Sequence, residues 1–217
     1  MATTKNTSGV ANAQANGHSN GKVSADGVSN QLREKQRGPI IQEFGTVRHL
    51  PLSMSGETRQ RSVEMLNQVL ADTITLASMY KKHHWQVSGA TFYQLHLLFD
   101  KHYEEQSLLI DTVAERIQLL GGVTTGMPAA VAKMSKIENP PDGVEEVPVQ
   151  VSRLLEAHEL ILKEVHEFAK EADEAGDDGT NDLLVSQVLR TNELQVWFIG
   201  SHLVDEPLIS TQGTTHN

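Results

Sequence analysis

The sequence predicts an all-α four-helix bundle, on three observations. Four long segments carry apolar residues at helical spacing. Glycine or proline interrupts the chain between these segments, and no segment shows the apolar–polar alternation of a half-buried strand. The second and third segments are separated by a long connection, residues 123–147, so the chain crosses over once between the two halves of the bundle.

The first two predicted helices form one hairpin. Residues 57–86 have a helical apolar period, and Ser55 precedes them as a suitable N-cap residue. Gly89 interrupts the chain, and residues 91–120 form the second predicted helix. The pair of glycines that begins at Gly121 ends this helix.

The second half of the bundle follows the crossover. Within residues 123–147 we expect one short helix over residues 129–135. Pro148 suits the first turn of a third long helix over residues 148–174, and residues 179–204 form the fourth. A four-helix bundle with one long crossover has the ferritin-like topology.

Composition divides the chain into four regions. Residues 1–37 are rich in Asn, Ser, Gly and Thr and predict a disordered, weakly basic arm. We expect residues 38–56 to be a connecting segment, residues 57–204 to be the bundle, and residues 205–217 to be a polar tail. The arm carries five basic and two acidic residues, which gives it a net charge of +3. Because the whole chain has a net charge of −10, the remaining residues carry −13. The basic residues of the arm are Lys5, Lys22, Arg33, Lys35 and Arg37.

Composition also excludes several classes of function. The 217 residues contain no cysteine, which excludes disulfides, thiolate zinc sites and a cysteine nucleophile. No apolar run reaches the roughly 18 residues of a membrane span, and the N-terminus has no apolar signal core. We therefore expect a cytoplasmic protein with no membrane partner. A net charge of −10 argues against a simple nucleic-acid binder.

Five potential metal ligands fall on the first two predicted helices: His84, His96, Asp100, Asp111 and Glu115. The second helix carries two pairs spaced by four residues, so each pair shares a helix face. At 100° per residue all four project within about a quarter turn, yet Asp100 and Asp111 are separated by about 16 Å along the axis. No single ion can contact both pairs, because metal bonds to nitrogen and oxygen are about 2 Å long.

An antiparallel two-fold dimer would bring the two pairs together. Asp111 and Glu115 of one chain would then meet His96 and Asp100 of its neighbour, and His84 could join the latter pair. The alternative without a metal is that each pair belongs to a solvent-exposed helix face, as most single pairs of this kind do. On the residues alone, both interpretations stay open.

The same residues resemble the Dps family. The run YKKHHWQVSGATFYQLHLLFD, residues 80–100, and the run DTVAERIQLLGG, residues 111–122, match its motif. In that motif a His-Trp pair is followed at +12, +16, +27 and +31 by His, Asp, Asp and Glu. Dps proteins are miniferritins, also called DNA-binding proteins from starved cells, and the match covers about residues 50–205. The resemblance implies a ferritin-like four-helix subunit assembled as a hollow homo-dodecamer.

The resemblance also implies an activity. One subunit would supply the three positions matching His84, His96 and Asp100, and its neighbour would supply Asp111 and Glu115. The expected reaction is ferroxidation: Fe(II) is oxidised to Fe(III) by hydrogen peroxide or O2, and the ferric mineral is stored in the cavity. Zinc could occupy the same ligands. Trp85 would lie near the site, either as core packing or as an electron donor.

Further residues carry weaker expectations. Acidic residues surround the turn before the fourth helix, and the resemblance implies that some line an iron entry pore, although helix capping is an ordinary role for them: Asp173, Asp177, Asp178 and Asp182. His158 or His166 could add a ligand to the metal site. Trp197 is expected in the core. Glu-x-x-His, the motif of intrachain di-iron sites in ferritins, is absent from the sequence.

Two alternatives to a ferroxidase remain open. The first is a nucleoid-associated protein that protects DNA through the basic arm, with iron oxidation secondary. Twelve copies of the arm would bind DNA multivalently through phosphates. The arm could instead be a solubilising tail or could stabilise assembly. The second alternative is a shell that holds structural zinc at its interface.

Overall fold

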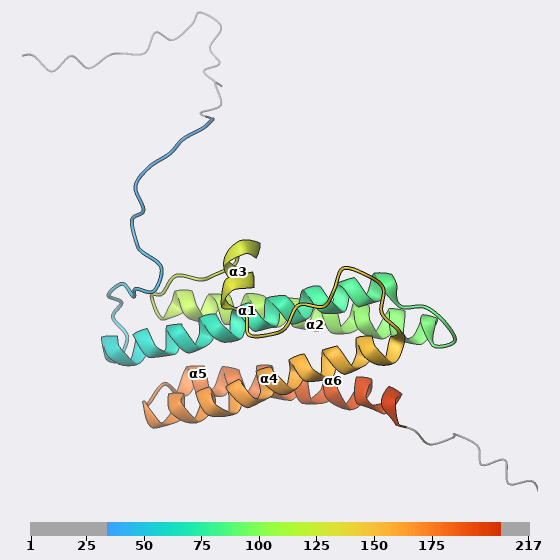
Figure 1. The fold of residues 1–217 in the computed structure, drawn as a ribbon. Helices are drawn as coiled ribbons and strands as arrows, with labels where there is room; N and C mark the ends of the chain where they lie inside the picture. The colour runs from blue at the N-terminus through green and yellow to red at the C-terminus, as the bar shows by residue number, and fades with distance from the viewer. Residues whose placement is uncertain (1–33, 205–217) are drawn as a thin grey trace, which may run out of the picture. The chain divides into compact units, whose positions relative to one another are not determined.

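The computed structural model describes residues 34–204 and has no β-strand among them. Its two long hairpins pack side by side as an all-α four-helix bundle (Figure 1). The helices α1 (Gly56–Gln86) and α2 (Phe92–Leu119) form the first hairpin. The predicted all-α, ferritin-like four-helix fold is confirmed.

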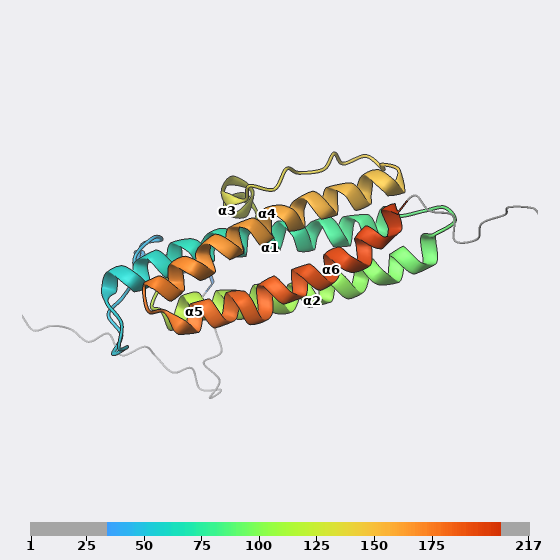
Figure 2. The same ribbon diagram turned by 90° about the horizontal axis from the view of Figure 1, so that it is seen from below.

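The second hairpin begins after the crossover. The short helix α3 (Pro128–Met134) lies against α1, on the outer side of the bundle (Figure 1). The crossover ends at α4 (Val147–Glu174), which packs on α1 and on the last helical stretch. Figure 2 shows that stretch lying alongside α2. The short helix predicted within the long connection is therefore present.

The last helical stretch contains a local irregularity that the sequence did not predict. It comprises α5 (Asp178–Leu183), a π-helical segment η1 (Leu184–Leu189), α6 (Arg190–Gly200) and the 3-10 turn η2 (Ser201–Leu203). The prediction of one regular helix over residues 179–204 needs this correction. A π segment adds one residue to a turn and shifts the face on which later side chains lie. After η1, the amides of Asn192 and Gln195 are buried in the bundle.

The predicted ends of the first hairpin have clear structural causes. The Ser55 hydroxyl accepts a hydrogen bond from the Thr58 amide and caps α1. At the end of α2, which lies beside the start of α1, Gly121 has a φ of 85° and its amide donates to the carbonyl of Gln118. A Cβ at Gly121 would lie 2.7 Å from the Arg48 carbonyl oxygen, so only glycine fits this turn.

The core is apolar but contains buried polar groups. Its largest fully buried side chains include Tyr80, Phe99 and Leu66.

Trp197 is not in the core of this subunit, because its relative exposure is 68%. The prediction for Trp197 is thus wrong: the buried positions of α6 are held by Asn192, Gln195 and Ile199, whereas Trp197 and Phe198 are exposed.

A buried pair of carboxyl groups joins α1, α4 and the residues after α3. Asp72 is fully buried and accepts hydrogen bonds from Gln68, from the Ser135 hydroxyl and from the Lys136 amide. The Glu164 carboxyl lies beside it and also contacts Lys136 Nζ at 2.6 Å. Burial, aided by the neighbouring Asp72 charge, raises the pKa of Glu164 to about 7 despite the opposing effect of Lys136.

This raised pKa predicts a pH dependence of stability. Between the ordinary Glu pKa and about 7 the folded state binds more protons than the unfolded state, so Glu164 destabilises the fold as pH rises through that window. The full effect is at most roughly 3 kcal/mol. We expect E164Q to flatten the change in unfolding free energy between about pH 5 and about pH 8. Chemical denaturation at both pH values measures this, with E167Q, at an exposed site on the same helix, as the control. Equal slopes for wild type and E164Q would contradict it.

The ends of the chain lie partly outside the described residues. Of the basic residues predicted for the arm, Lys5, Lys22 and Arg33 lie outside, whereas Lys35 and Arg37 are described and exposed. The predicted tail, residues 205–217, also lies outside. Within residues 34–204, no helix has the length and apolar character needed to cross a membrane.

Candidate metal centre

Three of the five predicted ligands meet where the first hairpin turns. His84 lies in the last turn of α1, and His96 lies in the second turn of α2. Their rings stack with centroids 3.8 Å apart and an interplanar angle of 20°. Asp100 follows one turn later on α2, and its Oδ1 lies 3.9 Å from His84 Nε2. The two helices therefore bring two imidazoles and one carboxylate together.

Reciprocal hydrogen bonds fix both imidazoles. His84 Nδ1 lies 2.7 Å from the His96 carbonyl oxygen, and His96 Nδ1 lies 2.8 Å from the His84 carbonyl oxygen. Because a carbonyl oxygen only accepts, each Nδ1 must carry the hydrogen and donate. In the neutral rings each Nε2 then keeps its lone pair. Metal-ligating histidines are held in this way, with one nitrogen bonded to a backbone carbonyl and the other left for the metal.

Lys81 completes this half of the site, and sequence reasoning missed it. Its Nζ lies 2.5 Å from Asp100 Oδ1 and 4.6 Å from the centre of the Tyr103 ring. The hydrogen bond from Lys81 lowers the pKa of Asp100, so the carboxylate is ionised and available to a cation. The only signal in the sequence was the position of Lys81, one turn before the His-Trp pair.

The other two predicted ligands lie further along α2. Asp111 and Glu115 are one turn apart and exposed. Neither carboxylate has a hydrogen-bond or ion-pair partner among residues 34–204. Since α2 is continuous from Phe92 to Leu119, Asp111 is about 16 Å along the axis from Asp100. His84, His96 and Asp100 are neighbours, but within the described part of a single chain neither they nor any other three His, Asp or Glu side chains are arranged to hold a metal ion by themselves.

The additional histidines have different environments. His158 is fully buried, and its two ring nitrogens contact Tyr80 and Asn192. This argues against the expectation that it adds a metal ligand. His166 is exposed on α4, and nothing in a single subunit places it near the other ligands. Trp85 is 71% exposed, so it does not serve as core packing within this subunit.

The acidic turn before α5 separates into two kinds of residue. Asp173, Asp178 and Asp182 are exposed, and their predicted role in a pore stays a prediction. Asp177 instead is fully buried and caps α5 through the Thr180 amide. Its carboxylate also accepts from Ser62 and Arg116. Asp177 therefore has a structural role rather than the pore position considered for it.

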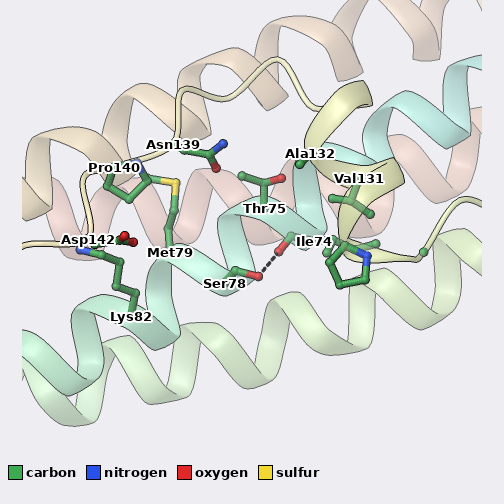
Figure 3. A pocket seen from close by; sticks show the side chains of 12 residues that line it. Ile74, Thr75, Ser78, Met79, Lys82, Val131, Ala132, Asn139, Pro140 and Asp142 are labelled. Carbon is green, nitrogen blue, oxygen red and sulfur yellow. Dashed lines mark hydrogen bonds between the residues drawn. The ribbon is translucent and has the colours of Figure 1, made fainter.

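The described chain also has a cavity that contains none of the five ligands. It has a volume of about 360 Å³ and lies between α1, α3 and the connection after α3 (Figure 3). Apolar side chains such as Met79 and Val131 line it, with Lys82 and Asp142 at one end (Figure 3). This lining offers no set of metal ligands.

Comparison with known proteins gives the family. The model of the Ferritin-like domain family matches residues 63–209. The structure of DpsC from Streptomyces coelicolor is similar with a TM-score of 0.78 and 62% sequence identity, over 79% of this chain and 99% of that one. This chain belongs to the Dps family of ferritin-like proteins.

Two relatives with lower sequence identity are also similar to this chain. The "DNA protection during starvation protein 1" of Deinococcus radiodurans is 32% identical over 69% of this chain and 72% of its own length. The "Nutrient stress-induced DNA-binding protein" of Nostoc sp. is 32% identical over 71% of this chain and 84% of its own length.

Proposed function

We propose that this Dps-family protein is a ferroxidase and an iron store. It oxidises Fe(II) with hydrogen peroxide or O2 at sites shared between subunits, and it keeps the ferric product as mineral inside a hollow homo-dodecamer. The observation that carries this proposal is the pair of stacked imidazoles, His84 and His96, whose Nδ1 atoms are anchored to backbone carbonyls. Each Nε2 is left free to bind a metal, and that of His84 lies 3.9 Å from the ionised carboxylate of Asp100.

The donor set fits iron. Imidazole nitrogen and carboxylate oxygen bind iron without the thiolates that favour softer metals. Five such donors include three carboxylates, whose negative charge offsets the positive charge gained when Fe(II) becomes Fe(III). Two Fe(II) ions supply the two electrons that convert one hydrogen peroxide to two hydroxide ions. No hydroxyl radical is then released, which would protect nearby molecules from oxidation.

The dimer supplies what one chain lacks. Asp111 and Glu115 are exposed carboxylates without partners among the described residues, one turn apart on the continuous helix α2. In an isologous interface each contact occurs twice, so antiparallel packing of α2 on its copy completes two sites at once. Lys81 must release Asp100 when iron enters, because the carboxylate oxygen that it contacts faces His84 Nε2.

Iron loading of the purified protein tests this proposal. Fe(II) is added with peroxide or with air, and ferric absorbance, native mass and retained iron are measured. Rapid oxidation and a mineral-filled shell of twelve subunits are expected. Oxidation at the rate of protein-free buffer would refute the ferroxidase. Zinc in the protein as purified, with no turnover after iron loading, would favour a structural metal at the same ligands.

DNA binding is a second candidate function, favoured by the names of the relatives. Two of them are called DNA-binding or DNA-protection proteins. The basic residues of 1–37 would contact phosphates, and a nucleoid location would follow. Gel shifts of the full chain and of a variant lacking residues 1–37, at several salt concentrations, test this. Binding that weakens steeply with salt and needs the arm is expected. The absence of any shift at low salt would exclude it.

A further inference from the structure

A chain of hydrogen bonds crosses the centre of the bundle, separate from the metal ligands. The Tyr80 hydroxyl on α1 lies 2.5 Å from His158 Nε2 on α4. His158 Nδ1 in turn lies 2.8 Å from Asn192 Oδ1 on α6, directly after the π-helical segment. All three side chains are fully buried. The network thus links three helices through groups that apolar packing alone would not require.

The direction of each hydrogen bond can be deduced from Asn192. Its Nδ2 donates to the Val188 carbonyl at 2.7 Å, which fixes its Oδ1 as the atom that faces His158. His158 Nδ1 must therefore carry a hydrogen and donate to that oxygen. Burial lowers the pKa of His158 to about 3, so the ring is neutral and Nε2 holds a lone pair. The Tyr80 hydroxyl consequently donates to His158.

The surroundings of Tyr80 keep the phenol dry and neutral. Burial raises its pKa well above the ordinary value, with a further contribution from the Glu105 charge. His102 Nδ1 lies 3.2 Å from the hydroxyl oxygen, and since that oxygen already donates its hydrogen, His102 donates to it. His102 Nε2 then has no partner among the described residues. Because both nitrogens of His158 are occupied, these groups do not form a metal site.

A phenol that donates to a neutral imidazole is arranged to lose an electron and a proton together. We propose that Tyr80 is a buried one-electron donor whose proton passes to His158 when it is oxidised. The neutral pair is stable before oxidation, because a buried imidazolium and phenolate would both be costly. Once the electron has left, the phenol becomes a strong acid, and His158 Nε2 accepts the proton across the existing 2.5 Å hydrogen bond.

The position of Tyr80 suggests when this donor is used, and this step rests on the proposed function. Tyr80 lies one helical turn, about 6 Å along the axis, before His84. Phe99 packs against the Tyr80 ring at 6.0 Å and directly precedes Asp100. A site that holds two Fe(II) ions can give peroxide both electrons. A site that holds only one is an electron short.

The balance of the one-iron reaction shows what Tyr80 supplies. One Fe(II) gives the first electron to hydrogen peroxide, producing Fe(III), one hydroxide and an oxidant of the hydroxyl-radical class. Tyr80 gives the second electron to that oxidant, which becomes a second hydroxide. The phenol O–H bond breaks, the proton moves to His158 Nε2, and a neutral tyrosyl radical remains. Two electrons reach peroxide, one from iron and one from tyrosine.

Freeze-quench electron paramagnetic resonance of the full-length protein tests the donor. The protein is mixed with peroxide after loading with one Fe(II) per site, and in parallel with two. A tyrosyl signal that is larger with one Fe(II) is expected. The sequence has three tyrosines, so Y80F should abolish the signal, while Y93F and Y103F should keep it. Native mass and thermal unfolding of each variant establish that it is folded.

The proton step has its own readouts. In wild type, radical formation should be slower in D2O, because the O–H bond breaks as the electron leaves. H158Q should lose most of the signal, since an amide accepts a hydrogen bond but does not take a proton. If H158Q does not fold, the isotope effect in wild type decides this step. A signal that forms equally fast in D2O would overturn the transfer to His158.

A second oxidant tests the electron-donor role of Tyr80 independently of the proposed ferroxidase activity. Ruthenium tris-bipyridine with persulfate, under a light flash, removes single electrons without iron. A Tyr80 radical formed by this photochemical oxidant supports the proposal that Tyr80 is an electron donor, even if the protein does not oxidise iron. No Tyr80 radical with either oxidant would overturn the donor. A radical with light alone, in protein that does oxidise iron at its sites, would overturn the coupling to iron.

Discussion

The double variant H96A/D100A should lose Fe(II) oxidation by peroxide at the protein sites. Together the substitutions remove one of the two imidazoles held by reciprocal hydrogen bonds and the carboxylate that lies beside the other one. Changing groups that only orient metal ligands costs about 10–100-fold in affinity or activity, so removal of two ligands should cost at least about 100-fold. The initial rate of ferric absorbance at limiting peroxide measures this loss.

The matched control for this double variant is H49A/D142A. It removes one histidine and one aspartate from exposed positions that lie outside the proposed site. We expect its rate to equal that of wild type. Both variants should keep their native mass and helical content, because neither pair of side chains is in the apolar core. A wild-type rate in H96A/D100A would show that iron is oxidised elsewhere.

D177A should cause a large loss of stability, although Asp177 belongs to an acidic turn whose other aspartates are exposed. The buried carboxylate accepts from the Ser62 hydroxyl at 2.6 Å, from Thr180 and from Arg116 Nη2 at 2.5 Å. Removing one partner of a buried ion pair costs about 3–5 kcal/mol. The Arg116 side chain keeps 21% of its exposure, so we expect the lower end of that range, about 3 kcal/mol. Thermal unfolding should shift down by about 6–12 °C.

D178A provides the control for D177A, since Asp178 is the exposed neighbour in the same turn. Its melting temperature should change little. The pH dependence gives a second check. Burial opposes ionisation of Asp177, but hydrogen bonds from Ser62 and Thr180 outweigh it and lower its pKa. Its contribution is therefore present above the ordinary Asp pKa and is lost as pH falls through the lowered value. Acid should destabilise wild type more than D177A.

The sequence predicts best what depends on local periodicity. The ends of α1 and α2 follow from Ser55 and from Gly121, and the ligand pairs on α2 follow from a spacing of four residues. Helix rise alone separates Asp100 from Asp111. These inferences need only the geometry of one helix, which is why they did not require the tertiary structure.

What the sequence did not predict depends on contacts between helices. The hydrogen bonds of His158 join residues that are 78 and 34 positions apart in the chain. The π-helical segment has no signal in composition, and the helix that follows it buries Asn192 and leaves Trp197 exposed. Asp177 resembled its exposed neighbours until the structure placed Ser62 and Arg116 beside it.

The central claim is that each site combines ligands from two subunits, and complementation tests it most directly. The variants H96A and E115A should each be inactive as pure oligomers. When both are co-expressed in equal amounts, about a quarter of the sites should combine the intact His96 half of one chain with the intact Glu115 half of another. The account predicts that Fe(II) oxidation returns to about a quarter of the wild-type rate in the mixed oligomers. Mixed oligomers as inactive as the pure variants would contradict a shared site.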